Sequence, residues 1–159
     1  MSGKLPPRNR RRGAAAVEFA VSFPFLLLLC LGAGDYGRML LHAVTIAHAA
    51  DAGSFFGAIS NINAVRYSDR QTLSVQDAEN IDHVNSVTAA ADSYCDCPDA
   101  PATGPTDPNA VSCSSTCAGY GTPRLFVRTR VNQSFEVVAP IPGIPDSVDV
   151  SRRVFMRVQ

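Results

Sequence analysis

A single carboxylate, Glu18, lies inside an apolar stretch that is long enough to cross a membrane. A basic leader ending in Gly13 precedes it, and the fifteen residues 20–34 that follow Phe19 carry no charge. A charged group within a membrane helix costs on the order of 2 to 3 kcal/mol even on lenient insertion scales. A sequence that keeps such a group usually needs it, so Gly13, Ala14, Glu18 and Phe19 are the first candidate functional residues.

A peptide bond cut between Gly13 and Ala14 would remove the whole leader and expose an α-amine on Ala14. Glu18 would then stand one helical turn from that amine. In a helical assembly this carboxylate could neutralise the amine of an incoming neighbour inside lipid, where either charge alone is costly. The alternative is an ordinary signal anchor whose acid lies close enough to the interface to be tolerated.

The second group that could carry chemistry is a set of four cysteines within 23 residues: Cys95, Cys97, Cys113 and Cys117. An even number of cysteines in a loop-rich segment outside the cytoplasm predicts two disulfides. A Cys95–Cys97 bridge would close a very tight ring, so we expect both bonds to join the C-x-C pair to the C-x3-C pair. A four-thiolate zinc site is the alternative, although these spacings differ from the usual C-x2-C pairs. Cys30 is expected to fill apolar space.

The remaining polar residues do not form a recognisable catalytic or ligand-binding pattern. Among the histidines we single out His48, which has Asp51 three residues further on, and such a pair is most often a solvated helix contact. The sequence contains no phosphate-binding loop, no nucleophile elbow and no convincing carboxylate pair. It therefore predicts a protein that is not an enzyme and that needs no cofactor or metal.

Charge is distributed unevenly along a chain whose formal net charge is zero. The first thirteen residues hold five cations and no acid, whereas the rest hold nine arginines against fourteen acids. A basic tip before an apolar run keeps the tip cytoplasmic and sends the remainder across the membrane. The sequence shows no second basic patch, so we expect no nucleic-acid partner.

The apolar stretch 14–34 has the length of one membrane span. Its 21 residues extend about 31 Å as a helix, and Pro24 is tolerated in such a helix. A removable secretory signal would have a shorter apolar core without an acid. A lipid-attachment site is disfavoured because Leu29, before Cys30, is not small.

Periodicity predicts an α+β protein with three regions, 1–13, 14–58 and 59–159. The first is an unstructured leader, and the second is one long transmembrane and amphipathic helix. The third is a small domain with a second helix, a disulfide-rich loop and an antiparallel strand pair. The predicted elements are a helix over 75–91, a loop over 94–121, a strand over 124–131, a proline-rich connector over 140–145 and a strand over 148–158.

Several motifs together resemble the TadE-like family of tight-adherence (Flp) pilus assembly proteins. They are R-R-G-A-A-A-V-E-F-A-x-x-x-P, D-Y-G-R, A-H-A-A-D-A-G, the two cysteine pairs and the final M-R-V-Q. The resemblance implies a pseudopilin, a minor pilin-like subunit that a dedicated aspartic prepilin peptidase processes. It places the cut after Gly13 and the acid–aromatic pair on Glu18 and Phe19. Many pilins carry phenylalanine where this chain has Ala14, which leaves methylation of the new terminus open.

The resemblance also implies a location and partners. We expect a single-pass protein of the bacterial inner membrane with a cytoplasmic leader and a periplasmic domain. It would take part in biogenesis of a type IVb Flp pilus, with the prepilin peptidase, other pilin or pseudopilin subunits and the inner-membrane assembly platform as partners. The alternative is an uncleaved, membrane-anchored periplasmic binding or metal-binding module.

Overall fold

The computed structural model describes residues 11–79, 86–138, 143 and 145–159. These residues form two compact units, Met1–Arg38 and Met39–Gln159, of which the first is described from residue 11. The long helix α1, Arg11–Ala58, contributes residues to both units.

The first unit consists of the apolar half of α1. Alanine and leucine, two strong helix formers, dominate this segment, and the helix continues through Pro24. Its large apolar side chains are not covered by other parts of the chain: Phe19 is 61% exposed and Val21 is 75% exposed. Within the described part of the chain, one helix is long and apolar enough to cross a membrane. The predicted long N-terminal helix is confirmed, and it begins at Arg11, three residues before the expected start.

The second unit is built on a four-stranded antiparallel sheet with the strand order β2-β1-β3-β4. The strands are β1 Val87–Asp96, β2 Ala110–Val111, β3 Arg124–Glu136 and β4 Ser147–Arg157. β3 lies in the middle and pairs along its length with both β1 and β4. β4 is therefore an edge strand.

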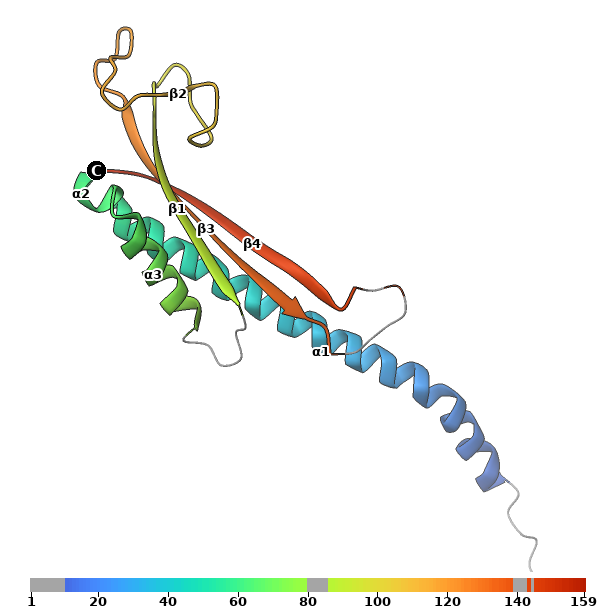
Figure 1. Cartoon of the computed structure of the whole chain (residues 1–159). Coiled ribbons are helices and arrows are strands. Elements are labelled where there is room, and N and C mark those ends of the chain that lie inside the picture. The colour runs from blue at the N-terminus through green and yellow to red at the C-terminus, as the bar shows by residue number, and fades with distance from the viewer. Residues whose placement is uncertain (1–10, 80–85, 139–142, 144) are drawn as a thin grey trace, which may run out of the picture. The chain divides into compact units, whose positions relative to one another are not determined.

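Helices cover one face of this sheet (Figure 1). They are the part of α1 from residue 39 onward and α3, Tyr67–Glu79, joined through the short α2, Asn61–Ala64. Ser60 caps α2 by accepting a hydrogen bond from the Asn63 amide. The main core cluster between helices and sheet is Ile46, Ala49, Ala50, Ala78 and Val131. The C-terminus returns to the end of α1, where the Gln159 amide donates to the Ala58 carbonyl.

Alternation along β3 decides which of its side chains face the helices. Every second residue from Val127 to Phe135 is buried, while those between them are partly exposed. The half-buried strand predicted over 124–131 is thus confirmed, and it continues to Glu136. The final strand predicted over 148–158 is present as β4, Ser147–Arg157.

The second helix lies earlier in the chain than predicted. The prediction of a helix over 75–91 is wrong: α3 ends at Glu79, and β1 begins at Val87. The predicted residues 80–85 lie outside the described residues. The helical prediction relied on apolar residues spaced three or four apart between 75 and 91. Some of these residues belong to α3 and others to β1, so the spacing does not reflect one helix. The alternation of Val87 and Ala89 toward the core was hidden because alanine is compatible with either structure.

The segment predicted as loop, 94–121, contains strand residues at two places. β1 continues to Asp96, and β2 pairs with it at the positions Cys95↔Val111 and Asp96↔Ala110. The sheet therefore has four strands instead of the predicted pair. Within the proline-rich connector, 139–142 and 144 lie outside the described residues, and Gly143 has a positive φ of 94°.

A fully buried arginine, Arg70 on α3, joins the helices to the sheet. Its five N–H groups donate hydrogen bonds to the carbonyls of Gly53, Ala64, Asp92 and Arg128 and to Thr129 Oγ1. Burial lowers the pKa of Arg70, and the nearby Asp92 opposes this effect. This single side chain connects α1, the end of α2, β1 and β3.

Candidate functional site

The candidate processing residues lie in the first two turns of α1. Gly13 is the third residue of the helix, and a Cβ at this position would meet nothing within 4 Å. Ala14 and Glu18 are four residues apart and therefore share one face of the helix. Both side chains are exposed, and the neighbouring ring of Phe19 lies 5.3 Å from that of Phe23.

The Gly13–Ala14 peptide bond is helical in the structure, because α1 begins two residues earlier. A peptidase needs an extended backbone in its cleft, so this first turn would have to unwind before a cut. The cost is small, since helix ends fray and glycine disfavours a helix by about 1 kcal/mol relative to alanine. The structure therefore offers a bond that could be reached at an accessible helix end.

The part of α1 in the second unit has an exposed apolar face that we call the outer stripe. It consists of Leu41, Val44 and Phe55 on α1 and of Ile59 directly after its end, which are exposed by 70%, 55%, 65% and 57%. Their spacing places them on one side of the helix, and the exposed His48 and Asp51 lie between them. Sequence reasoning found the helix but did not separate this stripe from the buried one, because both faces of α1 are rich in apolar residues.

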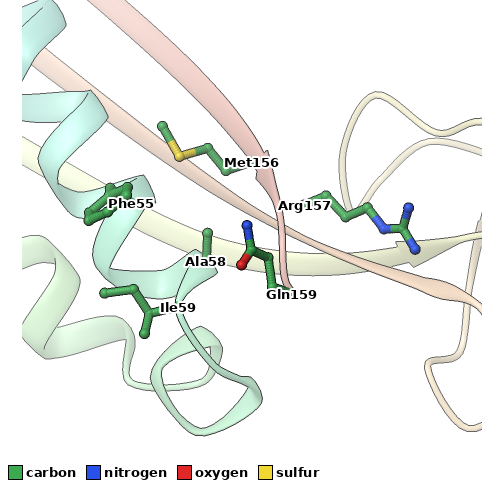
Figure 2. A pocket seen from close by; sticks show the side chains of 6 residues that line it. All are labelled: Phe55, Ala58, Ile59, Met156, Arg157 and Gln159. Carbon is green, nitrogen blue, oxygen red and sulfur yellow. The ribbon is translucent and has the colours of Figure 1, made fainter.

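An open apolar groove lies at the end of the outer stripe (Figure 2). It has a volume of about 370 Å³ and is lined by Phe55, Ala58, Ile59, Met156, Arg157 and Gln159. Phe55 and Ile59 belong to both the groove and the stripe. Figure 2 shows the guanidinium of Arg157 directed away from the groove, so its walls are mainly apolar.

The four clustered cysteines form two disulfides, Cys95–Cys113 and Cys97–Cys117. Both bonds join the C-x-C pair to the C-x3-C pair. Asp96, between the first two cysteines, is buried and accepts hydrogen bonds from the Ala102 amide and from Arg124. The disulfides use the thiolates that a zinc site would need, and the described residues contain no group of three potential metal ligands.

Two of the three histidines, His42 and His48, lie among the described residues, both on α1. His42 lies on the sheet side of α1, with its Nδ1 2.9 Å from Gln133 Nε2 and its ring against Phe135. His48 is exposed within the outer stripe. His83 lies outside the described residues.

The N-terminal region of the chain is similar to a known protein family. A family model described as "TadE-like protein" matches residues 13–54, about a quarter of the chain. Over residues 13–54 the chain is therefore similar to TadE-like proteins. No curated protein and no solved structure matches the chain. The match begins at Gly13 and covers the candidate processing residues and two members of the outer stripe, Leu41 and Val44. It confirms the predicted resemblance over residues 13–54, whereas the cysteine pairs and the final M-R-V-Q lie outside the match.

The TadE-like match supports a general role of pseudopilin type, associated with the Tad pilus. Members of the TadE-like family are structural components of the pilus. The one N-terminal apolar helix is suited to serve as a single-pass membrane anchor.

Proposed function

We propose that this TadE-like protein is a minor pseudopilin of a type IVb tight-adherence pilus, processed by the prepilin peptidase between Gly13 and Ala14. The observation that carries the proposal is the coincidence of two features. The TadE-like match begins at Gly13, and α1, which already includes Gly13, places Ala14 and Glu18 on one face. Cleavage would create an ammonium group on Ala14, on the same helix face as the Glu18 carboxylate. The carboxylate of one subunit could then neutralise the ammonium group of a neighbouring subunit.

The direction of insertion follows from charge. The leader carries five cations and no acid, which favours its retention in the cytoplasm and the transfer of the second unit to the periplasm. Two disulfides in the second unit are consistent with an oxidising compartment.

Assembly would use the outer stripe of α1. Four large apolar side chains that are each more than half exposed are unusual on one face of a small domain. In a pilus or a priming complex, the helices of neighbouring subunits would cover this stripe and exclude water from it. The peptidase, other pilin-like subunits and the assembly platform are the partners that this role requires.

The N-terminus of the mature protein tests the proposal. Mass spectrometry of protein purified from cells with an active peptidase should find Ala14 as the first residue. Gly13→Leu should accumulate full-length precursor, while the matched Gly13→Ala should be processed with at most a modest delay. Normal processing of Gly13→Leu, or native protein that keeps residues 1–13, would instead favour an uncleaved membrane-anchored module.

A further inference from the structure

The face of the sheet opposite the helices, which we call the outer face, gathers most of the arginines of the folded unit. Residues 14–159 contain nine arginines, and five of them lie on this face: Arg124, Arg128, Arg130, Arg153 and Arg157. The strand register brings together positions that are distant in sequence, such as Arg130 and Arg153. The sequence showed no basic patch here because these arginines alternate with core residues on two separate strands.

Two of the five arginines are neutralised by acids on β1. Arg124 pairs with Asp96, and Arg128 forms a two-pronged hydrogen-bonded pair with Asp92. The disulfide-bonded loop reaches the face at the same end, where Gly104 lies against Arg128. This end of the outer face is thus both charge-balanced and covered.

The other three arginines have no carboxylate within ion-pair distance among the described residues. Arg130 and Arg153 are directly opposite each other on adjacent strands, an arrangement that is destabilising for like charges. Charges on an edge strand can serve to prevent aggregation, and this accounts for Arg153 and Arg157 on β4. It does not account for Arg130, because β3 is a central strand.

Groups of other chemistry adjoin the Arg130–Arg153 pair. The next position along β4 on the same face is Phe155, whose side chain is 43% exposed. On the opposite side lie Asn132 and Ser151, which are paired across the strands. Successive positions on one face are about 7 Å apart. Two guanidinium groups, an exposed aromatic ring, an amide and a hydroxyl therefore lie within about 14 Å along the sheet.

We propose that the outer face binds an anionic polysaccharide whose sugars carry carboxylate groups. The planar guanidinium groups of Arg130 and Arg153 match a carboxylate in geometry and charge. The ring of Phe155 offers an apolar surface to the C–H face of a sugar ring, and Asn132 and Ser151 can exchange hydrogen bonds with its hydroxyls. The bound carboxylate also relieves the repulsion between the two arginines.

The arrangement of aromatic rings favours this ligand over a nucleic acid. Single-stranded nucleic acids bind where several aromatic rings stack on successive bases along a basic groove. On the outer face, Phe155 is the exposed ring next to Arg153, whereas Phe126, opposite Arg157, is partly buried and stacks on the buried Tyr94. A neutral polysaccharide would leave Arg130 and Arg153 without a counter-charge.

The test uses the full chain in detergent, with binding measured to polygalacturonate, to neutral dextran and to single-stranded DNA at near-physiological salt. We expect polygalacturonate to bind in preference to the other two. The double variant Arg130→Gln/Arg153→Gln should lose at least about tenfold in affinity, because two charge-assisted contacts disappear. The matched control is Arg66→Gln, which removes an exposed arginine paired with Asp69 on the helical side and should change the affinity less than about twofold.

Phe155→Leu supplies a second variant that keeps every charge. It should weaken polygalacturonate binding by at least about threefold while leaving the dependence of affinity on salt unchanged. Three results would overturn the proposal: no binding of polygalacturonate, tighter binding of DNA, or an equal loss of affinity in Arg66→Gln. None of these results bears on cleavage after Gly13, which is tested separately by the N-terminal mass.

Discussion

Arg70 lies directly against Gly57, so closely that a Cβ on Gly57 would come within 2.7 Å of Arg70 Nε. The absence of a side chain at Gly57 allows the buried guanidinium to lie beside α1 and reach carbonyls on four elements. Gly53, one turn earlier, leaves similar room for Ser74 and the Arg70 backbone. The two glycines and the arginine thus form one unit that holds α3 between α1 and the sheet.

The first prediction concerns this close approach. Gly57→Ala should lower the free energy of unfolding of the second unit by about 1 to 3 kcal/mol, because Arg70 must move and its hydrogen bonds weaken. Gly37→Ala is the matched control, since Gly37 is also helical in α1 and has open space around it. Chemical denaturation in detergent measures both variants. Equal stabilities for the two would contradict the packing described here.

The second prediction concerns the stapled loop. The disulfides join residues 18 and 20 apart, and each should contribute about 3 kcal/mol by restricting the unfolded chain. Replacing both Cys95 and Cys113 with serine should lower the midpoint of thermal unfolding while leaving Cys97–Cys117 intact. Peptide mapping without reduction checks the remaining bond. An unchanged midpoint would show that the bond adds nothing to stability.

The third prediction is a pH dependence within the same loop. Hydrogen bonds from the Asn109 amide, the Thr103 hydroxyl and the Thr103 amide lower the pKa of Asp107. A carboxyl group with a lowered folded-state pKa stabilises the fold above its unfolded pKa, and this contribution is lost as pH falls through the folded value. The wild type should therefore be more stable than Asp107→Ala at pH 7.

The difference between the two proteins should shrink in the acid range, as pH falls through the lowered pKa of Asp107. Thermal melts of both at a series of pH values measure it. A constant difference at all pH values would mean that the carboxylate contributes only through its shape.

The fourth prediction rests on the proposed function. Glu18→Ala should insert into the membrane and fold, because it removes a charge from the apolar helix and lies outside the second unit, yet it should prevent pilus formation. Glu18→Gln keeps the shape without the charge and should fail as well, since the proposed role is to neutralise an ammonium group. Electron microscopy counts the pili, and membrane fractionation checks insertion. Normal piliation in Glu18→Gln would remove the pairing argument.

Local signals along the chain were enough to predict several elements of the fold. The apolar run after the leader predicts the long helix, and the alternation around Val127 and Val131 predicts β3. The cysteine spacings predict two bonds between the pairs, and their partners are now Cys95–Cys113 and Cys97–Cys117. Each of these signals lies within a few tens of residues.

Features that depend on residues far apart in the chain could not be predicted from local signals. The alanines of β1 carry little preference of their own, and their pairing with β3 makes them a strand. Arginine is usually a surface residue, yet Arg70 is buried. Its five donors are satisfied by groups as distant in sequence as Thr129. The outer face exists because the β3–β4 register places Arg130 opposite Arg153. Pairing between strands selects such neighbours by hydrogen bonding and core burial, and neither can be read from one segment alone.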